Sequence, residues 1–278
     1  VVLDANPRRH KRFDEKTQEV LMIMEEGDTS DLFRQNLRTA GLNGLPVAEA
    51  MGQQDDPEAL LVGKRLYLRE LLDDLAEKIF QLVNEYAARF PLRLGIPKEE
   101  TRRKCKFKAG VAEWNAICKA LSLEGRWLVV GDRIVLNQSG PALSKEMADA
   151  VQTANSELAA FGLNWPGLDS WAEDSPVFKS AAGLKEFKPL EVSRYLVDHA
   201  LAVAINNDYL VSCDAYADLL QRLRTHFAAE EEMLFSTFRE LSGLTRKLGI
   251  PMLEHLDQAG VTVRQSDARR AGPTLQEN

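Results

Sequence analysis

The sequence of 278 residues is poor in the residue types that build metal and disulfide sites. It holds three cysteines and four histidines, and no two cysteines form a CxxC pair. An odd number of widely spaced cysteines fits reduced thiols, so Cys105, Cys118 and Cys213 are each predicted to be small buried apolar side chains. The histidines lack metal-ligand spacing with these cysteines, and we interpret His199 and His255 as structural residues.

Motifs of the common catalytic classes are also missing. There is no GxxxxGK[ST] phosphate loop, no GxSxG and no HExxH. The acidic run Glu230-Glu231-Glu232 is better explained as a solvated loop before a helix than as a carboxylate site, since adjacent like charges do not converge on one ligand. We therefore expect no catalytic site, no metal site and no cofactor in this chain.

Long apolar runs and positive charge are scarce as well. No stretch approaches 18 uncharged apolar residues, so no membrane-spanning helix is expected, and the start does not resemble a secretory leader. The net charge of -7 excludes a protein covered in positive charge, so any nucleic-acid site must be a local patch. Because the chain begins at Val1, within a strand-like pattern, we expect it to be a piece of a longer protein.

What the sequence does contain is a repeated two-stranded pattern with a tight turn. The four copies are LLVGKRLYL (60–68), WLVVGDRIVL (127–136), AVAINNDYLV (202–211) and VTVRQSDARR (261–270). The first three turn at residues that tolerate positive φ, namely Gly63-Lys64, Gly131-Asp132 and Asn206-Asn207-Asp208. A spacing of roughly 60 to 75 residues indicates a repeated small domain.

Helical periodicity precedes each hairpin. Helices are predicted within 17–52, where Gly41-Leu42-Asn43-Gly44 interrupts them, and over 69–90, 98–104, 110–121, 144–161, 214–228 and 234–241, with 162–174 irregular. Pro91 ends the long second-module helix. A last helix opens at Thr245 and carries Pro251 in its first turns. Three helices followed by a hairpin form the winged-helix pattern.

The predicted fold is therefore mainly α with small β-hairpins, an α+β class of four tandem winged-helix domains in an extended arrangement. The predicted domains are 13–70, 71–138, 139–211 and 212–272. A flexible tail is predicted over 273–278.

Basic side chains gather in the last predicted domain. Arg246 and Lys247 lie in the first turn of its third helix, where backbone N–H groups and the helix dipole favour a phosphate. The hairpin adds Arg264, Arg269 and Arg270, and arginine suits phosphate because its planar fork donates two bonds. A solvated face in which Glu254 and Asp267 pair with these cations is an equally supported interpretation. For Phe235 and Phe238, helical spacing favours core packing over base stacking.

The segment 235–270 resembles the C-terminal signature of the bacterial selenocysteine-specific elongation factor, SelB. The matching elements are Phe238-Arg239, Arg246-Lys247, Pro251, Leu253-Glu254, Asp257, Thr262 and Arg264. VVLDANPRRHKRF (1–13) resembles the end of that factor's third β-barrel and its basic linker, which assigns 1–12, and FPLRLGIPKEETR (90–102) resembles a motif of its second winged-helix unit. The chain departs from the pattern at Gln265-Ser266-Asp267 and at Arg270-Ala271-Gly272.

The resemblance implies a non-catalytic part of a cytoplasmic, monomeric translation factor that carries selenocysteinyl-tRNA. GTP and Mg²⁺ would belong to the preceding domains, and this part would bind the selenocysteine insertion (SECIS) hairpin of the mRNA beside the ribosome at UGA codons, without a membrane. Its expected RNA-binding residues are Arg246, Lys247, Arg264, Arg269, Thr245, Arg239 and Arg270. Arg239 and Arg270 are predicted either as flanking contacts or as ion pairs at the edge of the core.

Two other functions are open. A winged-helix transcriptional regulator would bind duplex DNA more tightly than an RNA hairpin, usually as a dimer. A protein-interaction scaffold would agree with the acidic net charge.

Overall fold

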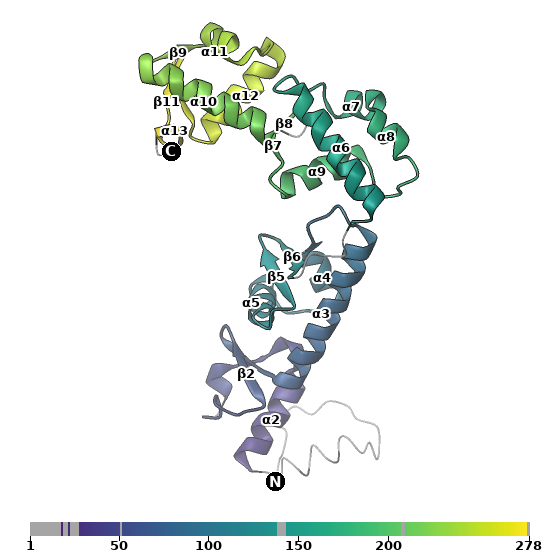
Figure 1. Ribbon diagram of the computed structural model, residues 1–278. Helices are drawn as coiled ribbons and strands as arrows, with labels where there is room; N and C mark the ends of the chain where they lie inside the picture. Colours follow the sequence, from purple (N-terminus) through teal and green to yellow (C-terminus); the bar gives the residue numbers. More distant parts are fainter. Residues whose placement is uncertain are drawn as a thin grey trace. The chain divides into compact units, whose positions relative to one another are not determined.

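The computed structural model describes residues 28–50, 52–137, 143–206 and 209–276, together with Gln18 and Met22. The expected barrel end and linker (1–12) and the turn residues Asn207-Asp208 lie outside the described residues. The chain divides into two compact units, 1–89 with 95–141 and 90–94 with 142–278 (Figure 1).

The first module begins with α2 (Thr29–Ala40), whose N-cap Asp28 accepts a hydrogen bond from the Asp31 N–H at 2.9 Å. It continues with η1 (Gly41–Asn43), β1 (Leu45–Pro46), η2 (Val47–Glu49), β2 (Ala59–Val62) and β3 (Arg65–Leu68). Phe33 and Leu37 of α2 are buried against Leu66 of β3, so the amphipathic helix covers the small sheet.

The second module contains the predicted long helix, α3 (Arg69–Arg89), which ends just before Pro91. It is followed by β4 (Ile96–Pro97), α4 (Lys98–Lys104), α5 (Val111–Ser122), β5 (Trp127–Val130) and β6 (Arg133–Leu136). The predicted helices are confirmed within a residue at each end. Trp114 and Trp127 are almost completely buried and supply much of this module's apolar volume.

The third module consists of α6 (Lys145–Phe161), α7 (Leu168–Asp174), α8 (Pro176–Ser180), α9 (Pro189–Asp198), β7 (Ala202–Asn206) and β8 (Tyr209–Ser212). The prediction of an irregular stretch over 162–174 is wrong for its second half, which forms α7. This short helix is stabilised by contacts with other elements, because buried Trp171 packs on Trp165 and donates its indole N–H to Glu157 at 2.9 Å. Such tertiary contacts leave no periodic signal in the sequence.

The fourth module contains the predicted helices and hairpin, with bounds that differ by a residue. It contains α10 (Cys213–Ala229), β9 (Met233–Leu234), α11 (Phe235–Ser242), α12 (Arg246–Gln258), β10 (Thr262–Gln265) and β11 (Ala268–Ala271). Gly243 ends α11 in the left-handed conformation at φ 69°, which glycine adopts without steric cost. Where a flexible tail was predicted, α13 (Pro273–Gln276) forms instead, and its Leu275 is buried in the core.

Three modules share one sheet topology. A two-residue strand ahead of a helix pairs antiparallel with the second hairpin strand, as β1 with β3, β4 with β6 and β9 with β11. In the described part of the third module, the sheet contains β7 and β8. The winged-helix, α+β class is confirmed, whereas the four predicted boundaries and the extended arrangement stay predictions.

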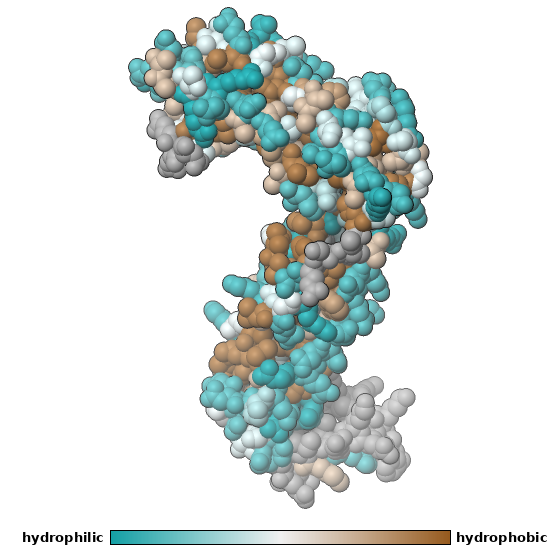
Figure 2. Space-filling view, viewed as in Figure 1, coloured by the Kyte–Doolittle hydropathy of each residue, from teal (hydrophilic) through white to brown (hydrophobic). Residues whose placement is uncertain are grey.

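The outer strands of the first unit carry apolar side chains on their exposed face. Leu61 of β2, and Leu128 and Val130 of β5, are about half exposed. Figure 2 shows hydrophobic surface in this part of the unit. Both strands lie at sheet edges.

The second unit has one continuous hydrophobic core. Its buried side chains extend from Met147 in α6 through Leu219 in α10 and Leu256 in α12 to Leu275 in α13. α12 also packs on β7, where His255 hydrogen-bonds the backbone of Ile205. The third and fourth modules are therefore joined by packing as well as by the chain.

The other predictions for single residues have mixed outcomes. Cys105 and Cys118 are free and buried, as predicted, but Cys213 is only partly buried. Burial raises the pKa of the Cys118 thiol to about 12. Across the described ranges, no helix is both long enough and apolar enough to cross a membrane.

Candidate nucleic-acid interface

A groove of about 390 Å³ lies in the fourth module where the start of α12 faces the β10–β11 wing. Its lining residues are Phe235, Arg246, Ile250, Leu253, Glu254, Arg264, Ser266, Asp267 and Arg269. The structure thus brings together three of the predicted RNA-binding residues, Arg246, Arg264 and Arg269. The sequence did not reveal the apolar wall of Phe235 and Ile250, because helical spacing alone assigned such residues to the core, where the Leu253 side chain does lie.

The start of α12 presents positive charge to solvent. Thr245 is the N-cap but makes no side-chain capping bond, and Thr245, Arg246 and Lys247 are all exposed. Within the described parts of the chain, neither Arg246 nor Lys247 has a carboxylate within ion-pair distance. First-turn N–H groups and two available cations make this end of the helix suitable for an anion.

The wing places two arginines on one face. Arg264 of β10 lies directly opposite Arg269 of β11, and directly opposed residues of an antiparallel pair share a face. Arg264 is exposed, and its guanidinium makes only a long hydrogen bond, 3.4 Å, to the Ser266 carbonyl. Like charges in this arrangement repel each other, so the wing concentrates positive charge at the cost of some stability.

That repulsion is reduced by Asp257 at the end of α12. Its carboxylate accepts hydrogen bonds from the Arg269 guanidinium (Nη2–Oδ2 3.0 Å) and from the Thr262 hydroxyl (2.5 Å). The Arg269 side chain is only 12% exposed. Arg269 therefore has a structural task in holding the wing, and its role as a direct RNA contact stays a prediction.

The remaining predicted residues lie outside the groove lining. Arg270 pairs with Glu231 (3.0 Å) and Glu232 (2.7 Å), which is the ion-pair alternative expected for this residue. The same pairs engage part of the acidic run that was predicted to be a solvated loop. Arg239 is exposed on α11 and lines no part of the groove.

The alternative of a self-neutralised surface receives only partial support. Glu254 and Asp267 do line the groove, but neither forms an ion pair with another described residue. Arg246 and Arg264 thus remain available to a ligand, while Arg269 is engaged by Asp257. Phe238 is completely buried, as its spacing predicted, and Phe235 is partly exposed at the groove wall.

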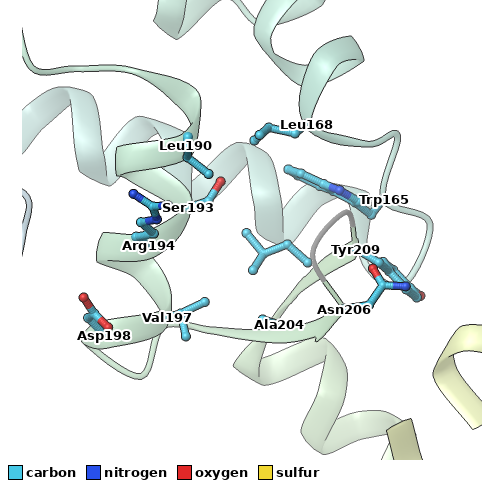
Figure 3. Close-up of a pocket in the computed structure, with 11 residues that line it drawn as sticks. Trp165, Leu168, Leu190, Ser193, Arg194, Val197, Asp198, Ala204, Asn206 and Tyr209 are labelled. Carbon is cyan, nitrogen blue, oxygen red and sulfur yellow. The ribbon is translucent and has the colours of Figure 1, made fainter. Parts of the chain in front are cut away.

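A second cavity, of about 360 Å³, belongs to the third module. Figure 3 shows Trp165 and Tyr209 on one side and the α9 residues Leu190, Ser193 and Val197 on the other. Arg194 is the one cation in its described lining, and it bonds to Glu191 at 3.5 Å. This cavity lacks the charge that a nucleic-acid backbone requires. In the described ranges, no group of three or more His, Cys, Asp or Glu side chains is arranged to hold a metal ion.

Comparison with known proteins matches two parts of the chain to family models. Both models are described as elongation factor SelB, winged helix, and they match residues 67–135 and 225–271. Two segments of the chain thus match SelB winged-helix models. The resemblance to the C-terminal region of SelB that the sequence suggested is thereby confirmed, and the second match covers the whole helix–wing groove.

Two longer proteins are similar to nearly the whole chain. The selenocysteine-specific elongation factor of Desulfomicrobium baculatum is 25% identical over 286 residues, which cover 96% of this chain and 43% of that protein. A crystal structure of the bacterial selenocysteine-specific elongation factor EF-Sec matches 97% of this chain and 42% of its own with a TM-score of 0.54. At 18% identity this second likeness shows the fold. The chain spans less than half the length of either relative.

Proposed function

We propose that this chain is the mRNA-binding region of a selenocysteine-specific elongation factor and that its fourth module binds the SECIS RNA hairpin in the helix–wing groove. Binding there would hold the factor beside the ribosome, so that selenocysteinyl-tRNA is delivered at UGA codons. The observation that carries the proposal is the convergence of Arg246 and Arg264, both exposed and without carboxylate partners among the described residues, on one groove. The SelB matches support the choice of a translation factor.

The groove suits an RNA stem-loop in two respects. Arg246, Lys247 and Arg264 would hold backbone phosphates through charge-assisted hydrogen bonds. The deep, narrow major groove of A-form RNA excludes a helix, so recognition would depend on shape and on unstacked loop bases. The apolar wall of Phe235 and Ile250 offers such a base a contact surface. At about 390 Å³, the groove falls within the usual size of small-ligand sites.

The other parts of the proposal concern the longer protein. GTP and Mg²⁺ would be bound by domains that precede this region, and this chain would contribute RNA recognition without catalysis. We propose a cytoplasmic, monomeric factor whose further partners are the ribosome and selenocysteinyl-tRNA. Thr245 would act through its backbone at the α12 start, and Arg239 would be a flanking contact.

The test is a titration of the chain with the hairpin of its own mRNA, a scrambled hairpin and duplex DNA, each at two salt concentrations. Arg246→Ala and Arg264→Ala should each weaken hairpin binding about tenfold, because a hydrogen bond to a charged group contributes roughly 1.5–3 kcal/mol. Each should also reduce the salt slope by about one, as expected for one lost phosphate contact.

Lys185→Ala is the matched control, because it removes an exposed cation of the same unit that forms no ion pair with another described residue. It should leave affinity and salt slope unchanged. Tighter binding to duplex DNA than to the hairpin would identify a DNA-binding regulator instead. If replacing both Arg246 and Lys247 by alanine leaves every nucleic-acid affinity unchanged, a protein-interaction scaffold would be favoured.

A further inference from the structure

A second group of cations lies in the second module, in the last turn of α4 and in the connection to α5, far along the sequence from the groove. Over 98–108 the sequence holds six cationic residues and two carboxylates, in a chain whose net charge is -7. We call Arg103, Lys104, Lys106 and Lys108 the basic loop. All four are exposed, while the intervening Cys105 and Phe107 are buried, with 5% and 4% exposure. The alternation of exposed and buried side chains places the charges in solvent, while the buried Cys105 and Phe107 attach the loop to the core of the module.

The anchoring holds the basic loop in one conformation. The Phe107 ring packs on Trp114 with 5.1 Å between centroids, and the Trp114 indole N–H donates to the Lys98 carbonyl at 2.9 Å. The Phe107 N–H donates to the Arg102 carbonyl at 3.1 Å. Lys106 has a φ of 56°, in the left-handed region where glycine would be unstrained. A lysine thus stands where the backbone favours glycine, and strained positions of this kind cluster at functional sites.

The surrounding carboxylates neutralise only part of this charge. Glu99 bonds to Arg102 at 2.8 Å, and Glu100 bonds to Lys104 at 2.9 Å. Glu113 lies in the first turn of α5, with its carboxylate close to Gly110. In the described part of the chain, Arg103, Lys106 and Lys108 have no carboxylate within ion-pair distance. Three cations with fixed backbone positions are therefore available to a polyanion.

We propose that the basic loop binds the sugar–phosphate backbone of double-helical RNA, independently of sequence, as a second contact besides the helix–wing groove. Lysines act as point charges that suit phosphates without reading bases. The choice of RNA over other polyanions rests on the proposed function, since the loop lies within the SelB winged-helix match over 67–135. A sequence-independent contact of this kind would add affinity and steer association.

The test measures binding of the chain to a labelled RNA duplex that has no loop, to a DNA duplex of the same length and to the mRNA hairpin, at two salt concentrations. Lys106→Glu with Lys108→Glu should weaken RNA-duplex binding more than tenfold and reduce its salt slope by about two. Lys106→Gly removes one charge and also relieves the strain of a positive φ. This variant should therefore fold at least as well as the wild type and still bind the RNA duplex more weakly. The matched control is Lys64→Glu with Lys119→Glu, which changes the net charge equally at two exposed lysines of the same unit. It should retain affinity.

The outcomes separate the two proposals. Arg246→Ala should weaken hairpin binding more than RNA-duplex binding. The basic-loop variants should weaken RNA-duplex binding more than hairpin binding, because the hairpin keeps its contact with the groove. Unchanged RNA-duplex affinity in both basic-loop variants, an equal loss in the control, or tighter binding to the DNA duplex would each overturn the inference. RNA-duplex binding that depends on the basic loop would support it even if the groove failed to bind the hairpin.

Discussion

The Asp257 carboxylate at the end of α12 is bound by the Arg269 guanidinium from the second wing strand, with Nη2–Oδ2 at 3.0 Å and Nε–Oδ1 at 3.2 Å. Thr262, the first residue of the wing, donates to the same carboxylate. One side chain thus fixes both strands of the wing against the helix that carries Arg246. The geometry of the groove depends on this contact, although Asp257 itself does not line it.

Asp257→Asn should lower the free energy of unfolding by about 2 kcal/mol, because a partly buried charge-assisted contact is lost and Arg269 is left opposite Arg264. Urea denaturation measures this change. Glu254→Gln is the matched control in the same helix, and it should stay within about 0.5 kcal/mol since Glu254 is exposed and unpaired among the described residues. Equal stability of the Asp257 variant and the wild type would contradict the structural role given to this carboxylate.

Gly272→Ala should destabilise the protein by about 1–3 kcal/mol through steric overlap. A Cβ at Gly272 would lie 2.1 Å from the Gly260 carbonyl oxygen, where the end of β11 passes the end of α12. This close approach explains why glycine is required at this position. Gly183→Ala serves as the control because a Cβ there meets nothing within 4 Å. Thermal unfolding should show a lower Tm for the first variant alone, and matching Tm values would be inconsistent with the packing described.

Stability should fall as the pH decreases below about 6.5 because of His255. Burial lowers the pKa of His255 from its ordinary value of 6.5, against an opposing hydrogen bond with the Ile205 backbone. The unfolded chain then binds more protons, so the stabilisation is complete above pH 6.5 and is lost as the pH falls through the lowered pKa. Its ring also meets the edge of Tyr216, with centroids 5.6 Å apart. Unfolding free energies from pH 8 to pH 5 should decline less in His255→Gln, and parallel curves would count against this assignment.

The pair of Arg93 and Glu191 should stabilise the second unit. Two parallel hydrogen bonds of 2.8 Å join them, and this contact holds the pKa of Glu191 below its ordinary 4.5. Glu191→Gln should therefore cost about 1–3 kcal/mol at neutral pH. The stabilisation is present above pH 4.5 and is lost as the pH falls through the lowered pKa, so wild type and variant should converge in acid. Denaturant titrations at a series of pH values from 7 downward measure the difference in unfolding free energy between wild type and variant. A difference that does not shrink as the pH falls below 4.5 would point to a cause other than charge.

The sequence predicts most of this fold because its elements carry local signals. Periodicity and caps locate α3, α6 and α10, and turn residues locate the hairpins. The two-residue strands β1, β4 and β9 have too few residues for any alternation, so only pairing with distant strands defines them. α7 is likewise determined by contacts of Trp171 rather than by its own pattern.

The candidate site, too, has features that follow from local sequence and one that depends on tertiary contacts. The exposure of Arg246 and Lys247 follows from their place in the first helical turn, and the tight turn at Ser266-Asp267 implies that Arg264 opposes Arg269. The partner of Arg269 does not follow, since the sequence suggested Glu254 and Asp267, whereas tertiary packing selects Asp257. Whether the groove holds RNA stays a prediction.

The unbroken core of the second unit has a consequence for how the third and fourth modules behave. Because side chains from α6 to α13 are buried in one cluster, separating the modules near residue 212 would expose apolar surface on both. They should therefore unfold in a single transition, although the sequence pattern repeats on either side of residue 212. A ligand bound at α12 would also act on β7, because the two elements are in direct contact.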